Sequence, residues 1–180
     1  MTLNCNGKLI DLSTPKVMGI LNVTPDSFYD GGKFKNDKSF LIHAEKLIKE
    51  GADFVDIGAY SSKPGADFVS EKEEINRLIP IVRLIHDNFP QTPISIVSFR
   101  SNVIKKSIQA GAAIVNDISA GQLDSMMFET VGKLGVPYIM MHMRGTPQIM
   151  QQMTTYSNII KDIYDYFAER NSLAKEHQIK

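Results

Sequence analysis

Five short apolar runs recur along the chain, and each is followed by a segment in which apolar residues repeat every three or four positions. The runs lie at residues 17–21, 54–57, 94–97, 113–115 and 138–141. Apolar runs of this length are typical of strands that are buried on both faces of a parallel sheet. The pattern therefore predicts five parallel strands.

The segments between the runs have the three-to-four-residue apolar spacing of amphipathic helices. Ser70 and Glu73 form a capping box at the start of one of them, although Pro80 interrupts its early part. We predict helices at residues 40–50, 70–85, 101–108, 124–134 and 155–174. Strands that alternate with helices through short connections indicate a chain of βα units, an α/β fold.

The alternation is compatible with two architectures, a doubly wound open sheet or a TIM (β/α)8 barrel. The 180 residues form one domain, 1–180, with no linker or low-complexity segment. An eight-unit barrel takes about 250 residues, so length alone favours the open sheet. An additional β-hairpin is predicted at residues 3–12, where Asn6 and Gly7 supply a favoured two-residue turn.

Composition narrows the class of partner. The chain has 20 Lys and Arg against 20 Asp and Glu, so its formal net charge is zero. A nucleic-acid or membrane-surface role gets no support from this balance, and no apolar run is long enough to span a bilayer. The one cysteine, Cys5, cannot form an internal disulfide, which is consistent with a reducing cytoplasm. We expect a cytoplasmic protein that acts on small molecules.

Polar side chains follow every predicted strand, and in both architectures ligands bind beyond the carboxyl ends of the strands. The groups, in chain order, are Asn22; Ser61, Ser62 and Lys63; Ser98 and Arg100; Asn116 and Asp117; His142 and Arg144. Taken singly, Asp117 and Ser98 are turn formers, and His142 is a packed histidine. Together, the five groups predict a polar pocket of mixed charge.

The residue types suggest what this pocket binds. Two hydroxyls and a cation at residues 61–63 suit an anionic oxygen such as that of phosphate. The carbonyl oxygen of Asn22 suits Mg²⁺, which often bridges to phosphate, and Asn116 can both donate to and accept from the edge of a flat heterocycle. No GxGxxG motif, Walker loop or nucleophile–histidine–acid series is present, which argues against an NAD enzyme.

Four segments resemble the signature motifs of the dihydropteroate synthase family, in the same order. They are MGILNVTPDSF at 18–28 followed by DGG at 30–32, DIGAYSSKPGA at 56–66, AGAAIVND at 110–117, and MHMRGTP at 141–147. Because this family has the pterin-binding type of TIM barrel, the resemblance overrides the length argument. It implies a partial barrel of about five βα units with an N-terminal β-hairpin.

The resemblance also implies an activity. The family joins 6-hydroxymethyl-7,8-dihydropterin diphosphate to 4-aminobenzoate in folate synthesis, with Mg²⁺ assisting the departure of diphosphate, and it is the target of sulfonamides. Its members tend to form homodimers. The roles carried over are catalysis for Asn22, Asp26, Ser27, Phe28 and Lys63; substrate binding for Ser61, Ser62, Lys63, Val97, Asn116, Met140 and Met141; and metal binding for Asn22.

The chain departs from the family pattern in three places. Val97 stands where the family has an aspartate that binds the pterin, and Ser62 and Lys63 replace a threonine and an arginine. The family's sixth to eighth units have no counterpart, so we expect a chain truncated at its C-terminus, with open sheet edges, that is inactive alone. Two alternatives remain: a non-catalytic or degenerate pterin-binding fragment, and a pterin-dependent methyltransferase domain.

Overall fold

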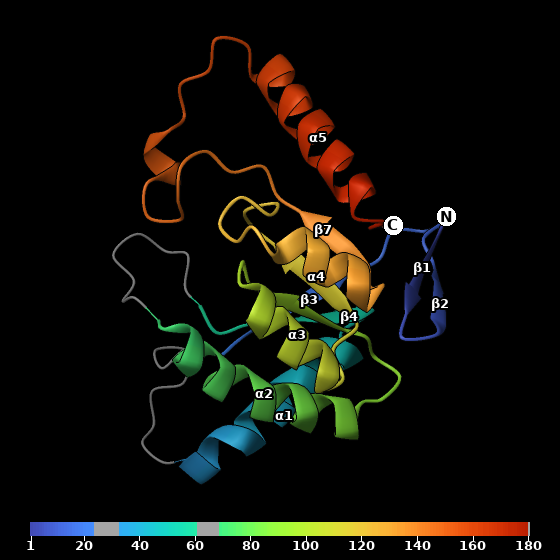
Figure 1. Ribbon diagram of the computed structural model, residues 1–180. Helices are drawn as coiled ribbons and strands as arrows, with labels where there is room; N and C mark the ends of the chain where they lie inside the picture. The colour runs from blue at the N-terminus through green and yellow to red at the C-terminus, as the bar shows by residue number, and fades with distance from the viewer. Residues whose placement is uncertain (24–32, 61–68, 180) are drawn as a thin grey trace.

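The computed structural model describes residues 1–23, 33–60 and 69–179 (Figure 1). Two strands form an antiparallel hairpin, and five form a parallel sheet. The elements are β1 Thr2–Cys5, β2 Lys8–Asp11, β3 Met18–Asn22, α1 Lys33–Lys49, β4 Phe54–Gly58, α2 Glu71–Asn88, β5 Ile94–Val97, α3 Ser101–Gln109, β6 Ile114–Asp117, α4 Met127–Leu134, β7 Tyr138–Met140, the 3-10 helix η2 Met150–Gln152 and α5 Ile159–Glu176.

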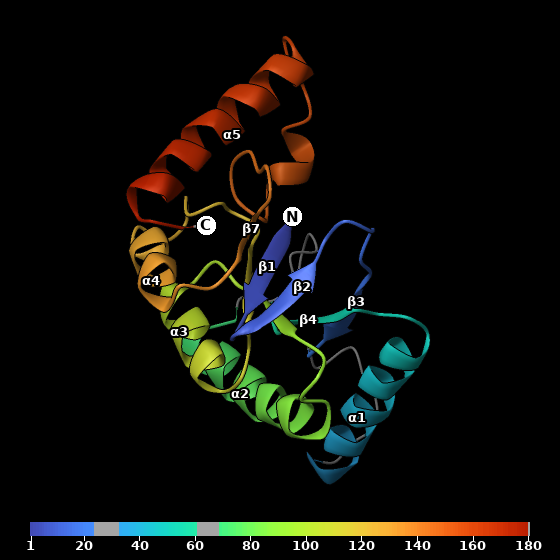
Figure 2. The ribbon, with the colours of Figure 1, turned by 90° about the vertical axis from the view of Figure 1, so that its right-hand side faces the viewer.

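The parallel sheet keeps the order of the sequence, β3-β4-β5-β6-β7. A doubly wound sheet reverses its strand order and carries helices on both faces, whereas a barrel does neither. Here the helices follow one another along one side of the sheet as an arc (Figure 2). The strands therefore form part of a barrel wall, which confirms the partial TIM barrel and shows that the argument from length was misleading.

Alternation along the strands separates an outer face from an inner face. Outward side chains such as Leu21, Ile57 and Val115 are fully buried against the helices in one continuous core. The inner face is more open, and Ile20 on β3 remains 61% exposed there. β3 and β7 are the edge strands of the described sheet.

The hairpin closes the end of the strands opposite to the candidate site (Figure 2). Asn6 and Gly7 have φ angles of 52° and 86°, as a two-residue turn of type I′ requires, which confirms the predicted turn. Cys5 packs against Phe54 and Ile114, residues at the beginnings of β4 and β6. Burial raises the pKa of the Cys5 thiol, so this cysteine is a packing group rather than a nucleophile.

Side-chain caps explain where the observed helices differ from the predicted ones. The Ser70 cap of α2 is confirmed, since its side chain accepts from Glu73 N at 3.2 Å. The helix predicted from residue 124 begins at Met127, and the Asp124 carboxylate accepts from Met126 N at 2.9 Å and from Ser101 N at 2.7 Å. The last helix begins at Ile159 rather than at 155, because Asn158 is its N-cap.

Candidate active site

The strand register brings polar and small residues into one row near the carboxyl end of the inner face. Asn22 pairs with Gly58, Gly58 with Val97, and Val97 with Asn116. Three residues predicted for the site, from strands well separated in the sequence, therefore lie side by side. Gly58 leaves the middle of the row without a side chain. A Cβ at this position would lie 3.2 Å from the Cβ of Val97.

A buried carboxylate lies in the next layer of the inner face. Asp56 is 6% exposed, and its Oδ2 accepts a hydrogen bond from Asn116 Nδ2 at 3.0 Å. Its Oδ1 has no hydrogen-bond partner among the described residues. Burial raises the pKa of Asp56, and the Ser95 hydroxyl and the Asn116 amide oppose this increase in part. The buried free acceptor suits a ligand with N–H groups.

Asp56 was missed as a site residue in the sequence, although it lies within one of the quoted motifs. The run 54–57 has three apolar residues around Asp56, so the pattern predicts an apolar strand and does not single out its carboxylate. A charged residue inside a run that is predicted to be buried on both faces was the signal that could have identified it.

The two methionines predicted for the pterin pocket have different surroundings. Ile139 pairs with Asn116 on the inner face. Because side chains alternate along a strand, Met141, two residues later, lies on the same inner side. Met140 pairs with Asp117 on the outer side and lines a hollow of about 640 Å³ with Tyr164 and other residues of α5. The structure therefore does not bring Met140 together with Val97 and Asn116, because side chains alternate along β7.

The remaining predicted site residues lie outside the part of the chain that the structure describes. They are Asp26, Ser27 and Phe28 in one segment, and Ser61, Ser62 and Lys63 in another. Their roles stay predictions from the resemblance.

Asp117 holds the turn after β6. Its Oδ1 accepts from the backbone N–H and hydroxyl of Ser119, and its Oδ2 accepts from Gly121 N at 2.8 Å and from the Tyr138 hydroxyl at 2.6 Å. These bonds agree with its interpretation as a turn former. The pKa of Tyr138 is raised well above its usual range, first by burial and then by the Asp117 carboxylate.

Stability is expected to fall steeply above about pH 10, where tyrosines in the unfolded chain ionise. Because the folded pKa of Tyr138 is raised, its contribution is fully present below that pH and is lost as pH rises. Each such group contributes a slope of about 1.4 kcal/mol per pH unit. The measurement is the free energy of unfolding from urea titrations between pH 8 and 11. Above about pH 10, its decrease with pH should be less steep in Tyr138→Phe by the contribution of one ionising group. Tyr164→Phe, at a 72% exposed position, should leave it unchanged; equal slopes in both variants would contradict the assignment.

The rim beyond β5 contains a buried ion pair. Arg100 NH1 lies 2.5 Å from Glu74 Oε2, and the two side chains are 12% and 1% exposed. Arg100 NH2 also donates to the Val69 carbonyl at 2.8 Å, and the guanidinium lies 5.4 Å from the centroid of the Tyr60 ring. Arg100 therefore joins α2 to residues just before and just after the segment 61–68.

The connection after β7 is held by ring contacts. His142 packs edge-on against Tyr166, with ring centroids 4.7 Å apart, as expected for a packed histidine. Arg144 donates to the Thr155 carbonyl at 2.7 Å and lies 4.5 Å from the centre of the Tyr156 ring. In the described ranges no group of three or more His, Cys, Asp or Glu residues could hold a metal ion.

Comparisons with known proteins agree with this geometry. The family described as "Pterin binding enzyme" matches residues 18–180. Dihydropteroate synthase of Haemophilus influenzae is 40% identical over 172 residues, which cover 96% of this chain and 62% of that protein. The chain therefore spans less than two thirds of this relative.

Solved structures give the same picture. A structure of Yersinia pestis dihydropteroate synthase with a sulfonamide drug is 39% identical in sequence and has a TM-score of 0.90. The match covers 100% of this chain and 65% of the Yersinia pestis chain. Xanthomonas albilineans dihydropteroate synthase with 7,8-dihydropteroate is 31% identical and has a TM-score of 0.86, with coverage of 100% and 62%.

Proposed function

The chain belongs to the family of pterin-binding enzymes, and we propose that it supplies the pterin-binding part of a dihydropteroate synthase. The enzyme would join 6-hydroxymethyl-7,8-dihydropterin diphosphate to 4-aminobenzoate and release diphosphate. The observation that carries this proposal is the row Asn22, Gly58, Val97 and Asn116, which lies next to the buried Asp56 carboxylate. A relative bound to 7,8-dihydropteroate supports it.

The residues of this row would act mainly by positioning the pterin. Asn116 already donates one N–H to Asp56, so its second N–H and its carbonyl oxygen remain for the edge of a heterocycle. The free Oδ1 of Asp56 would accept an N–H of the ring. The small Gly58 leaves room for a flat ring beside Val97. Holding the pterin in one orientation would let the aromatic amine attack as diphosphate leaves.

Magnesium would be held by few protein ligands. Asn22 is exposed at the carboxyl end of β3 and offers a neutral amide oxygen, a ligand type that Mg²⁺ accepts. Substrate phosphate oxygens and water would be further ligands, as is usual for Mg²⁺. The ion would supply neutralisation of the charge that develops on the departing diphosphate.

The proposed setting is cytoplasmic, with a homodimer as the assembly and sulfonamides as inhibitors. No described helix is long and apolar enough to cross a membrane. The relative solved with a sulfonamide drug supports the last point.

The test is diphosphate release from the pterin diphosphate, with and without 4-aminobenzoate, measured beside binding of the pterin. In a protein that also carries the remaining barrel units, we expect release that requires both 4-aminobenzoate and Mg²⁺, and a loss of at least about tenfold in Asn116→Leu, because a partly buried polar contact is removed. The 180-residue chain alone should bind the pterin without release. Asn171→Leu, on the exposed surface of α5, is the matched control. Binding without release in the protein with all barrel units would indicate a non-catalytic pterin-binding protein, and absence of both would refute the proposal.

A further inference from the structure

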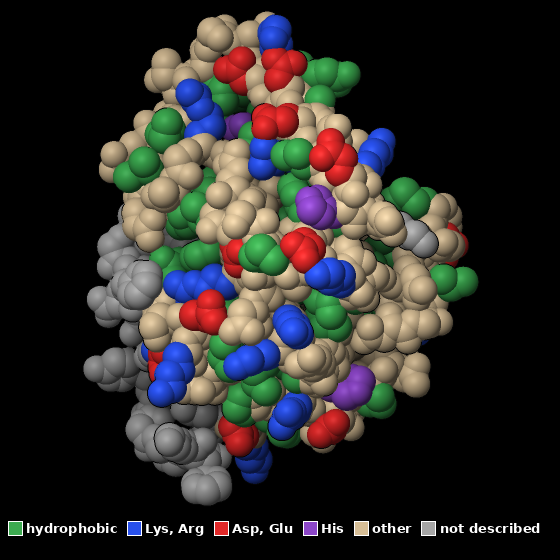
Figure 3. All heavy atoms as spheres, viewed as in Figure 1, with side chains coloured by type: hydrophobic (Ala, Val, Ile, Leu, Met, Phe, Trp, Pro, Cys, Tyr) green, Lys and Arg blue, Asp and Glu red, His purple; other side chains and the backbone are tan. Residues whose placement is uncertain are grey.

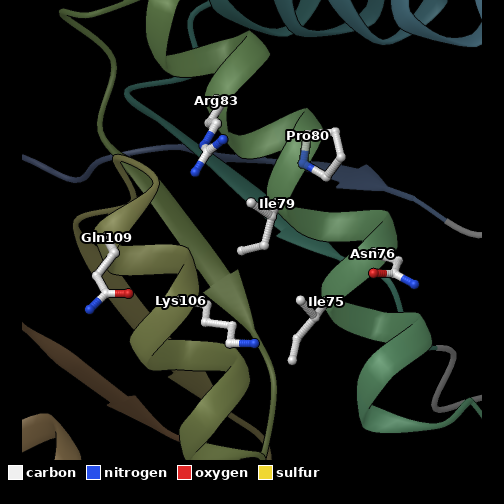
Figure 4. A pocket seen from close by; sticks show the side chains of 7 residues that line it. All are labelled: Ile75, Asn76, Ile79, Pro80, Arg83, Lys106 and Gln109. Atoms are coloured by element: carbon white, nitrogen blue, oxygen red, sulfur yellow. The ribbon is translucent and has the colours of Figure 1, made fainter.

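A hollow of about 330 Å³ lies on the outer surface between α2 and α3 (Figure 4). Its floor is apolar and includes Ile75, Ile79 and Pro80. Ile75 and Ile79 lie on the flank of α2 next to α3 and pack against the outer edge of the core that α2 forms with the sheet, whereas Pro80 is exposed. The hollow is therefore separate from the candidate active site.

Two cations border this floor from facing helices. Arg83 of α2 and Lys106 of α3 both extend into the space between the helices (Figure 4), and Lys and Arg side chains gather over this part of the surface (Figure 3). In the described ranges neither residue forms an ion pair, whereas Arg77 of the same helix pairs with Glu73. An anion in the hollow would be attracted by both positive charges.

Pro80 adds an acceptor to the hollow. Proline has no N–H, so the carbonyl of Asn76 loses the donor that position 80 would otherwise provide in the helix. Asn76 and Pro80 both line the hollow, and the Asn76 carboxamide has no hydrogen-bond partner among the described residues.

We propose that this hollow binds a small organic anion, a carboxylate on a compact apolar body. A carboxylate matches the planar fork of Arg83 and the point charge of Lys106. The apolar body would cover Ile79 and Pro80. The volume is at the lower end of the range for small-molecule sites, which commonly combine an apolar lining with a few polar groups.

The probe is benzoate, titrated into the ¹⁵N-labelled chain while amide chemical shifts are followed by NMR. Shifts are expected in residues 75–83 and 106–109. Arg83→Gln and Lys106→Gln should each weaken binding roughly three- to fivefold, the size of a single exposed charge contact. Lys105→Gln removes the same charge from the adjacent residue, which does not line the hollow, and should have no effect. Acetate, without the apolar body, and benzyl alcohol, without the charge, should bind more weakly.

The result is independent of synthase activity, because the readout reports where benzoate binds. Shifts confined to the inner face of the sheet would overturn the proposal, since they would place benzoate in the candidate active site. Equal weakening in Lys105→Gln and Lys106→Gln would also overturn it, because it would indicate non-specific attraction to a cationic surface.

Discussion

Replacing Arg100 with methionine is expected to lower the free energy of unfolding by about 3–5 kcal/mol, the usual cost of removing one partner of a buried ion pair. Glu74 is 1% exposed, and its Oε1 already lacks a hydrogen-bond partner among the described residues. Without the guanidinium, the whole carboxylate would be left without a counter-charge. The measurement is urea unfolding of both proteins at pH 7, followed by circular dichroism.

The pH dependence of this loss identifies its cause. Burial already raises the pKa of Glu74, while the Ser98 hydroxyl and the Arg100 guanidinium oppose the increase. In Arg100→Met the pKa should rise further, so the folded state binds a proton more readily than the unfolded state does. The stability deficit should therefore shrink as pH falls from 7 to 5. A deficit that does not change with pH would show that lost packing, rather than the buried charge, is responsible.

Arg77 provides a matched control, because it also pairs with a glutamate of α2. Its pair with Glu73 joins residues four apart, and the glutamate side chain is 47% exposed. Exposed pairs of this kind are worth about 0–1 kcal/mol, so Arg77→Met should have a small effect. The double variant Arg100→Met with Glu74→Leu should recover much of the loss, since no unpaired charge remains. Equal losses in Arg77→Met and Arg100→Met would contradict the prediction.

The sequence predicted the strands better than the site that they form. Short apolar runs depend only on near neighbours in the chain, and the strand predicted at 94–97 matches β5 at both ends. The pairing of Arg100 with Glu74 joins residues 26 apart and arises only when α2 packs beside α3, of which Arg100 is the N-cap. No local pattern carries that information, so the sequence indicated neither the pair nor its burial.

The same limit applies to the inner face. Polar residues after each strand predict a site at the carboxyl end of the sheet, because parallel strands share one carboxyl end. Which of those residues share a face depends on register, and a shift of one residue reverses the face. The structure places Asn116 beside Val97 on the inner face, whereas Met140 lies on the outer side. The carboxylate of Asp56 was overlooked because its neighbours in the strand are apolar.

Val97→Asp is expected to raise affinity for a pterin at least about tenfold. The resemblance to dihydropteroate synthases implies an aspartate at this position, and valine cannot accept the hydrogen bond of a ring N–H. A buried donor without a partner costs roughly 1–3 kcal/mol, which corresponds to roughly 5- to 150-fold in affinity. Val97 pairs with Asn116 and lies beside Gly58, so a carboxylate introduced there would face the predicted pterin site.

The measurement is calorimetric titration of 6-hydroxymethylpterin into the two proteins at pH 7. Val97→Asn is the matched control, because it has nearly the same shape as the aspartate variant and no charge, and it should gain less. The new carboxylate would share the inner face with Asp56, and a like charge nearby raises a carboxyl pKa. The gain should therefore diminish as pH falls and the acidic groups take up protons. Unchanged affinity in Val97→Asp would mean that another acceptor, for which Asp56 is the candidate, already binds the ring N–H groups.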